Sequence, residues 1–214
     1  MFEEADLRSK LGEIVHLFDN VKMLIIYCEE IAADFATYPQ VLLELRNTLD
    51  HILRAISAEL NPKPGYDSKY VLENLRKSYG HLFRAGYDAL DWTGIELRDL
   101  IVEELEEFSS ETILKVIPEY YQTMKPQILD FNRQIAEIRK RKDVANVDQN
   151  LEDFDKYLKI IKAIKEDYEK IVKVKPSLIE VEKASKKKNK RYWIGTIILA
   201  ITGIVVTYFL TKYL

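Results

Sequence analysis

Apolar residues in the first sixty positions recur every three or four residues, which is the spacing of one face of an α-helix. One such stripe runs over residues 7–36 and a second over residues 40–60, with an interruption at Tyr38 and Pro39. Because proline disfavours a helical conformation in the residue before it, the interruption separates two helices. The stripe positions are Leu11, Ile14, Phe18, Val21, Ile25, Cys28 and Ile31, followed by Leu42, Leu45, Leu49, Ile52, Leu53 and Ile56. The pattern therefore predicts two amphipathic helices.

The next break is residues 61–68, NPKPGYDS, which contain two prolines and a glycine and are expected to form a loop. A third helix is predicted from about Ser68 into the 90s, with Phe108 as its furthest end. Ser109 has the side chain expected of a helix N-cap, and Pro118 and Pro126 permit helix starts or kinks beyond it.

A further helical stripe lies in the second half, after a polar break at residues 142–148. Its positions are Leu151, Phe154, Leu158, Ile161, Ile164, Tyr168 and Ile171. Such a stripe can pack on the preceding body or on copies of itself. Pro176 is expected to end this helix, because proline interrupts the helical hydrogen bonds. Strand-like alternation persists nowhere in the sequence, so the predicted fold class is all-α, as an elongated helical bundle.

Residues 192–210, YWIGTIILAITGIVVTYFL, contain no charged side chain. At about 1.5 Å per residue, this run would span roughly 28 Å as a helix, close to the hydrocarbon thickness of a bilayer. Aromatic residues typical of membrane interfaces stand at its two ends, namely Tyr192, Trp193, Tyr208 and Tyr213. The sequence predicts one C-terminal transmembrane helix.

The basic run KKKNKR lies just before this helix, and only Lys212 follows it. Positive residues favour the cytoplasmic side, so we expect a cytoplasmic body and a single pass through the membrane. The acidic opening MFEEADLR does not have the character of a signal peptide. The predicted divisions are a helical body over 1–142, an amphipathic helix and basic linker over 143–191, the membrane helix over 192–210 and a short external tail over 211–214.

Charge is distributed unevenly along the chain. Of 32 basic and 35 acidic residues, residues 181–214 hold seven basic and one acidic, which leaves 25 basic and 34 acidic in residues 1–180. An acidic body argues against broad non-specific binding to nucleic acid. With one cysteine, three scattered histidines and no glycine-rich phosphate loop, the sequence predicts no metal, no cofactor and no catalytic residues.

The most informative feature is a local duplication. Residues 45–55 read LRNTLDHILRA and residues 75–85 read LRKSYGHLFRA, so both copies fit L-R-x-x-x-x-H-apolar-apolar-R-A. If the two helices form an antiparallel hairpin, the copies face each other and their basic side chains converge. The candidate ligand-binding residues are Arg46, His51, Arg54, Arg76, His81 and Arg84. Such a cluster suits a phosphate-bearing ligand, while the alternative is a structural network of ion pairs such as Asp50–Arg54 and Arg84–Asp88.

A stripe of small or hydroxyl-bearing residues follows one face of the predicted membrane helix. Its members are Thr196, Ala200, Gly203, Thr207 and Thr211. Small residues let helices approach closely, and hydroxyls can bond between helices or line a wet path. The alternative is that each threonine bonds the carbonyl four residues before it. We expect association through this face, and a pore would require an oligomer.

The spacing R-x-x-x-x-H on a helical domain resembles the HEPN superfamily, many of whose members are dimeric, metal-independent ribonucleases. Asn47 after Arg46 matches the polar residue often found there, and Lys77 after Arg76 matches it less closely. The resemblance implies that arginine and histidine act on the 2′-OH and the scissile phosphate of RNA. Here the motif is early and duplicated, whereas the family usually has one motif in a late helix.

The segment HLFRAGYDALDW, residues 81–92, is similar to helical domains of bacterial defence proteins. With the C-terminal anchor added, the architecture resembles membrane effectors of bacterial anti-phage systems, the nearest type being the Hailong effector. The resemblance implies a non-enzymatic homo-oligomer in the lipid bilayer of the bacterial inner membrane. It also implies control by an oligonucleotide or cyclic nucleotide signal made by a partner nucleotidyltransferase.

Three functions are compatible with the sequence. The first is a ligand-gated, oligomeric membrane effector that permeabilises the membrane. The second is a membrane-tethered HEPN-type ribonuclease. The third is a tail-anchored fusion or scaffold protein, against which we count Pro176, because it should break a continuous coil into the membrane.

Overall fold

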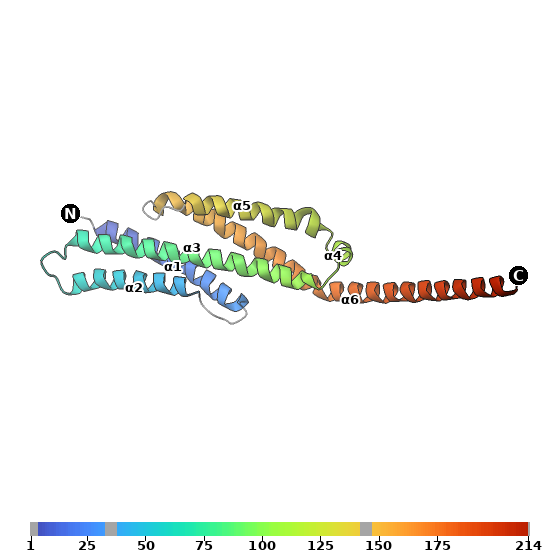
Figure 1. Ribbon diagram of the computed structural model, residues 1–214. Helices are drawn as coiled ribbons and strands as arrows, with labels where there is room; N and C mark the ends of the chain where they lie inside the picture. Colours follow the sequence, from blue (N-terminus) through green and yellow to red (C-terminus); the bar gives the residue numbers. More distant parts are fainter. Residues whose placement is uncertain (1–3, 33–37, 142–146, 214) are drawn as a thin grey trace. The chain divides into compact units, whose positions relative to one another are not determined.

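The computed structural model describes residues 4–32, 38–141 and 147–213, and within these ranges the chain is helical and contains no strand. The helices are α1 (Glu4–Ile31), α2 (Pro39–Leu60), α3 (Ser68–Glu106), α4 (Ser110–Val116), the short π-helix η1 (Tyr120–Met124), α5 (Lys125–Arg141) and α6 (Val147–Tyr213) (Figure 1). The predicted all-α class is therefore confirmed. The end of the first predicted helix and most of the polar break at 142–148 lie outside the described residues.

The chain divides into two compact units. The first combines Met1–Ile101 with Gln127–Tyr168, and the second combines Val102–Pro126 with Glu169–Leu214. The long helices α3 and α6 each contribute to both units.

Local signals begin and end several helices where the sequence predicts. Pro39 occupies the first turn of α2, and Tyr38 before it is extended (ψ 121°). Gly65 has φ 87° in the loop that joins α2 to α3, a conformation that favours glycine. The Ser109 side chain accepts a hydrogen bond from the backbone N–H of Thr112, so Ser109 is the N-cap of α4.

In the first unit, aromatic side chains of α3 and α6 form the centre of the core. The Phe154 ring lies 5.7 Å from that of Phe83 and 5.4 Å from that of Tyr87, and all three are almost fully buried. Tyr157 donates a hydrogen bond to Asp91 at 2.7 Å. Phe154, a member of the apolar stripe predicted over 151–171, therefore packs on the body of its own chain.

Two glycines of α3 allow this close approach. A Cβ on Gly86 would lie 2.8 Å from the Phe154 ring of α6 and 3.0 Å from Val21 of α1. A Cβ on Gly94 would lie 2.9 Å from Ile161 of α6. Helices pack at short distances only where small residues leave room, so these positions determine the spacing of α1, α3 and α6 in the first unit.

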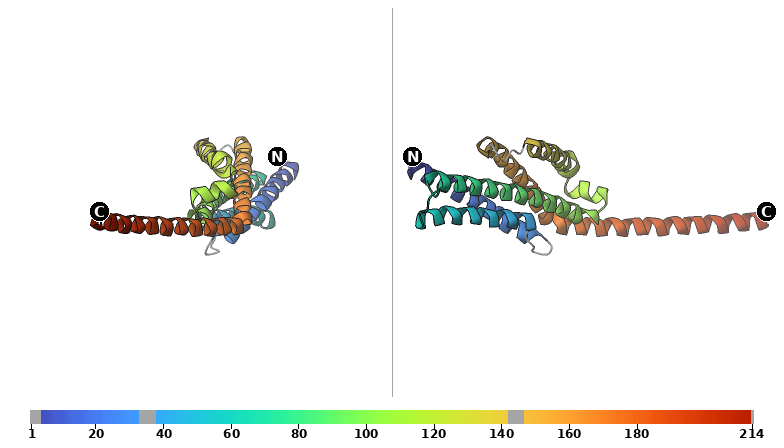
Figure 2. Two further views of the ribbon diagram at one scale, coloured as in Figure 1. Left: turned by 90° about the vertical axis from the view of Figure 1, so that its right-hand side faces the viewer. Right: turned by 60° about the vertical axis from the view of Figure 1, so that its left-hand side comes forward.

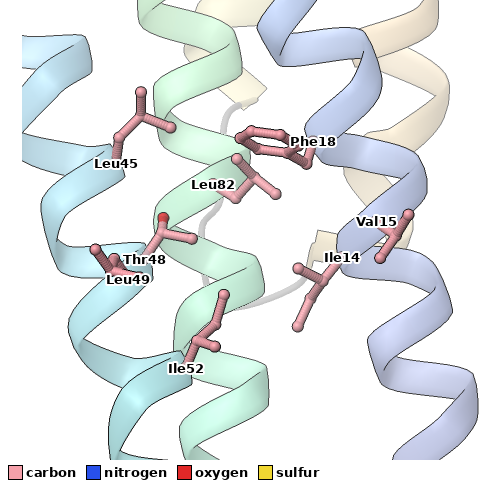
Figure 3. Close-up of a pocket in the computed structure, with 8 residues that line it drawn as sticks. All are labelled: Ile14, Val15, Phe18, Leu45, Thr48, Leu49, Ile52 and Leu82. Atoms are coloured by element: carbon pink, nitrogen blue, oxygen red, sulfur yellow. The ribbon is translucent and has the colours of Figure 1, made fainter.

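The apolar stripe of α2 lies on the surface, although an amphipathic helix ordinarily buries such a stripe. Leu42, Leu49, Leu53 and Ile56 are 46–55% exposed. The buried face of α2 instead carries smaller or polar side chains, namely Val41, Glu44, Thr48, Ala55 and Ala58. Leu45, Leu49 and Ile52 border an apolar groove of about 430 Å³ between α2 and α1, with Leu82 of α3 at its base (Figure 3).

Helix α6 continues through Pro176, so the prediction that this proline ends the helix is wrong. A proline inside a helix removes one hydrogen bond and costs about 3 kcal/mol. The carbonyl that loses its donor belongs to Val172, which is 41% exposed, so water can replace that donor. On either side, Ile171 and Leu178 are 1% and 0% exposed, and their packing holds both turns in the helical path. The continuity also removes the argument that Pro176 interrupts a coil.

In the second unit, a buried carboxylate joins α4 to α6. Oε2 of Glu182 accepts hydrogen bonds from the Thr112 hydroxyl at 2.6 Å and from the Ser109 hydroxyl and N–H at 2.9 and 3.2 Å. These hydrogen bonds lower the pKa of the Glu182 carboxyl to about 2. Lys175 and Glu104 form a further ion pair at 2.6 Å between α6 and the end of α3.

Within the described part of the chain, one helix is long and apolar enough to cross a membrane, as judged by length and composition. It is the portion of α6 over Glu152–Tyr208, and its apolar window is not buried in the rest of the protein. The predicted C-terminal span is thus present as a candidate. The type of membrane and the orientation stay predictions.

Substitution of Gly86 by alanine should lower the stability of the protein. The added Cβ meets Phe154 and Val21, and we expect a net loss of about 1–2 kcal/mol despite the gain in helix propensity. Gly80→Ala on the same helix is the matched control, because its Cβ meets no atom within 4 Å, and it should be neutral or stabilising by up to about 1 kcal/mol. Unfolding of the full chain in detergent, followed by circular dichroism, measures both; equal effects would contradict the packing argument.

Candidate functional site

The two copies of the repeat face each other across α2 and α3, which run antiparallel on either side of the loop (Figure 1). Nδ1 of His51 lies 2.9 Å from Oδ1 of Asn74, and Nδ1 of His81 lies 2.7 Å from Oε2 of Glu44. Each histidine therefore contacts the opposite helix, at the residue seven positions before the other histidine. The contacts are related by the approximate two-fold symmetry that the repeat predicts.

Glu44 and Asn74, the partners of the two histidines, are not among the predicted site residues. They occupy equivalent positions, immediately before Leu45 and Leu75, the first residues of the two copies. The similarity extends further upstream, since residues 41–46 read VLLELR and residues 71–76 read VLENLR. This extension of the repeat indicates that Glu44 and Asn74 are a pair, because it places one polar residue at the same position in both copies.

The predicted meeting of the two histidines is found. The rings of His51 and His81 are stacked, with centroids 5.3 Å apart and planes inclined by 18°. The two rings lie where α2 and α3 meet, with Asn74 and Glu44 at their Nδ1 atoms.

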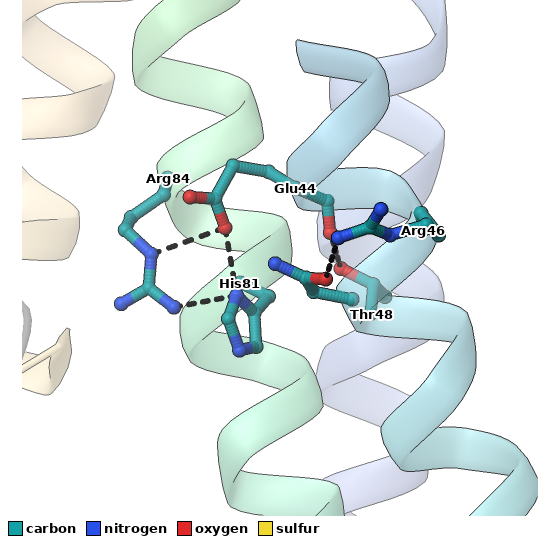
Figure 4. A network of polar contacts seen from close by, with 6 residues as sticks. Glu44, Arg46, Thr48, His81 and Arg84 are labelled. Carbon is teal, nitrogen blue, oxygen red and sulfur yellow. Dashed lines mark hydrogen bonds and ion pairs between the residues drawn. The ribbon is translucent and has the colours of Figure 1, made fainter. Parts of the chain in front are cut away.

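Glu44, His81 and Arg84 form a network between α2 and α3 (Figure 4). Oε2 of Glu44 lies 2.7 Å from Nδ1 of His81 and accepts a hydrogen bond from Nε of Arg84 at 3.2 Å. Glu44 is only 9% exposed. Burial raises the pKa of its carboxyl, but the hydrogen bonds from His81 and Arg84 outweigh this effect and hold the pKa below its usual value.

The same ring nitrogen of His81 also lies 2.6 Å from Nη2 of Arg84. One nitrogen cannot donate to a carboxylate and accept from a guanidinium at the same time. When Nδ1 carries a proton it donates to Glu44, and when it carries a lone pair it accepts from Arg84. The network therefore has two hydrogen-bonded forms that differ in the position of one proton.

The other arginines of the repeat do not join this network. Arg54 is equivalent to Arg84, but it pairs with Asp50 of its own helix at 2.9 Å, and both side chains are more than half exposed. The acceptor available across the helices in that copy is the neutral Asn74, which explains the difference. Arg46 donates a hydrogen bond to the neighbouring Asn47 of its own helix at 3.1 Å.

A shallow groove of about 260 Å³ lies beside the network on α3. It is lined by Glu73, Arg76, Lys77, Gly80, His81 and Arg84. Lys77 is paired with Glu73 at 2.7 Å, and Arg84 is paired with Glu44. Arg76 has no ion-pair partner among the described residues, so it supplies the excess positive charge of the groove. The donors present here suit one anionic group of the size of a phosphate.

The small-residue face of α6 is exposed where its side chains are described. Thr196 and Thr207 donate hydrogen bonds to the carbonyls of Tyr192 and Gly203, at 3.0 and 2.9 Å, as in the alternative considered for them. Gly203 has open space around its Cα. The side chain of Thr211 lies outside the described residues.

Comparisons of this chain with protein-family models, with curated proteins and with solved structures find no match.

Substitution of Glu44 by glutamine should destabilise the protein by about 1–3 kcal/mol at neutral pH, because charge-assisted hydrogen bonds to His81 and Arg84 are weakened. The pKa of Glu44 is lowered in the folded state, so its contribution is present above the unfolded pKa of about 4.5 and is lost as the pH falls below it. The difference between wild type and variant should therefore narrow below pH 4.5.

Asp50→Asn is the control for Glu44→Gln, since it removes a carboxylate from the exposed pair with Arg54 and should cost less than about 1 kcal/mol. Urea unfolding at several pH values measures both variants. An equal cost of the two substitutions at pH 7 would show that the burial of Glu44 has no energetic consequence.

Proposed function

We propose that this protein is a ligand-controlled membrane effector of bacterial anti-phage defence. Its cytoplasmic helical body binds a phosphate-bearing signal, either an oligonucleotide or a cyclic nucleotide, and its C-terminal helices associate in the inner membrane to form a pore or to disrupt the bilayer. The observation that carries the proposal is the basic groove on α3, which directly adjoins the buried Glu44–His81–Arg84 network.

The adjoining network supplies a route from ligand to structure. A phosphate in the groove competes with Glu44 for the guanidinium of Arg84, because both are anionic partners. If Arg84 pairs with the phosphate in place of Glu44, only His81 is left as a partner of Glu44. A buried carboxylate with an incomplete set of partners is unfavourable, so binding in the groove weakens the contact between α2 and α3.

Association of several copies is supported by two surfaces. One membrane helix cannot enclose a pore, and the face with Ala200 and Gly203 has the small residues that permit helices to approach closely. In the body, the exposed apolar stripe of α2 is a surface that association would remove from water.

A HEPN-type ribonuclease is the second candidate, because two histidines converge at one place. In this alternative, the His51 and His81 rings act on RNA with an arginine of the repeat. Its expected signature is metal-independent cleavage of RNA that His81→Ala abolishes.

Binding of an oligonucleotide should depend on Arg76 and not on its equivalent Arg46. Both arginines follow the leucine that begins each copy, but only Arg76 lines the groove. Titration of the full chain in detergent with a short oligodeoxynucleotide, and with a cyclic dinucleotide, should give an affinity at least tenfold weaker in Arg76→Gln. Arg46→Gln should leave the affinity within about twofold. Equal losses in the two variants would contradict the groove as the binding site.

The full chain reconstituted in liposomes should form discrete oligomers that release ions, and the oligodeoxynucleotide should change the rate of release. Gly203→Leu should reduce the release at least tenfold, because a bulky side chain blocks the small-residue face. Val205→Leu, on the opposite side of the helix, should have little effect. Liposomes that stay tight under all conditions would contradict the effector, and RNA cleavage sensitive to His81→Ala would then favour the nuclease.

A further inference from the structure

Four basic residues follow one face of α6 between its contact with α4 and the candidate membrane span. Lys183, Lys187 and Arg191 follow one another at intervals of four residues, and Lys190 comes three residues after Lys187, so all four lie within about a third of the helix circumference. All four are exposed, and none has an ion-pair partner among the described residues. The four residues are called the basic stripe below.

The opposite face of α6 is already occupied. Leu178 is fully buried there, and Glu182 bonds Ser109 and Thr112 of the α4 turn. Val181, Ser185 and Lys188 border a small cavity of about 160 Å³ against α4. Lys186 lies at the edge between the two faces, 3.4 Å from Glu182. The basic stripe therefore faces away from α4.

The residues of the basic stripe differ in their distance from the candidate membrane span. At about 1.5 Å per residue, Lys187 lies about 6 Å along the helix axis from Arg191, and Lys183 about 12 Å. The headgroup layer on one side of a bilayer is about 5–7 Å thick, and charges are screened beyond about 8 Å at physiological salt. Lys187, Lys190 and Arg191 are thus within reach of lipid headgroups, whereas Lys183 marks the outer limit.

We propose that Lys187, Lys190 and Arg191 form a one-sided binding site for the headgroups of anionic phospholipids. Long basic side chains reach toward the interface while their apolar stems stay against the helix, and each favours anionic lipid near the surface. The charge of this face is wholly positive and has no ion-pair partner in the part of the chain that the structure describes, which matches phosphate-bearing headgroups. The inference rests on the proposed membrane insertion of residues 192–210.

Trp193 is a natural reporter for this site, because it is 72% exposed and lies two residues beyond Arg191. The full chain is reconstituted in phosphatidylcholine vesicles with one-fifth phosphatidylglycerol, in which either lipid carries brominated acyl chains at the same mole fraction. Bromine quenches tryptophan fluorescence on contact. The Trp193→Phe variant measures the fluorescence contributed by Trp92, the other tryptophan of the chain.

Brominated phosphatidylglycerol should quench Trp193 more strongly than brominated phosphatidylcholine, and 1 M salt should reduce this preference. Lys190→Gln should lower the preference about two- to fivefold. Lys188→Gln is the matched control, with the same charge change two residues away but on the α4 side, and should leave the preference unchanged.

Equal quenching by the two brominated lipids in wild type would overturn the lipid site while leaving membrane insertion intact. Equal losses in Lys190→Gln and Lys188→Gln would overturn its one-sidedness, because net charge alone would then explain the preference. Absence of quenching by either lipid would overturn insertion, and the site with it.

Discussion

The need to pair a buried carboxylate determines how α2 is rotated about its axis. Glu44 is 9% exposed, and an ionised carboxylate at such a position is stable only when charged or hydrogen-bonding partners surround it. Those partners, His81 and Arg84, are on α3, so α2 must turn its polar side toward α3. Small side chains at Thr48, Ala55 and Ala58 follow on that side and permit close contact. The leucines of α2 are consequently left outside, which is the opposite of the usual arrangement.

The two copies of the repeat share a geometry but differ in charge. The acidic Glu44 in one copy corresponds to the neutral Asn74 in the other, and both bond a histidine at nearly the same distance. Only the carboxylate can recruit an arginine across the helices, so Arg84 crosses to Glu44 while Arg54 stays with Asp50. A symmetric scaffold therefore carries a single charged network, and the groove beside it has no counterpart built from the same pairing in the first copy.

Much of the fold could be predicted because its signals are local. Helical periodicity, the loop at residues 61–68 and the Ser109 cap need only neighbouring residues, and the meeting of His51 with His81 needs only a hairpin. The partners of the histidines depend on the register of α2 against α3, which periodicity does not contain. Helix α2 has a stripe of large apolar residues and a face of smaller or polar residues. Hydrophobicity alone predicts burial of the first, whereas the structure buries the second.

The continuity of α6 through Pro176 could not be predicted from local sequence either. The rule that proline ends a helix considers one turn, whereas the structure buries Ile171 and Leu178 on both sides of that turn. Packing on both sides of the proline thus overrides a local cost of about 3 kcal/mol. No property of residues 172–177 taken alone indicates this outcome.

The contact of Glu182 with α4 also fixes how the rest of α6 is rotated about its own axis. Eighteen residues at about 100° each complete five full turns, so Ala200 projects from the same side of the helix as Glu182. By the same arithmetic, Thr196, Gly203 and Thr207 fall within about 60° of that direction. The hydrogen bonds from Ser109 and Thr112 to Glu182 therefore determine the direction in which the small-residue face points. A rotation of α6 about its axis at α4 would turn that face through the same angle.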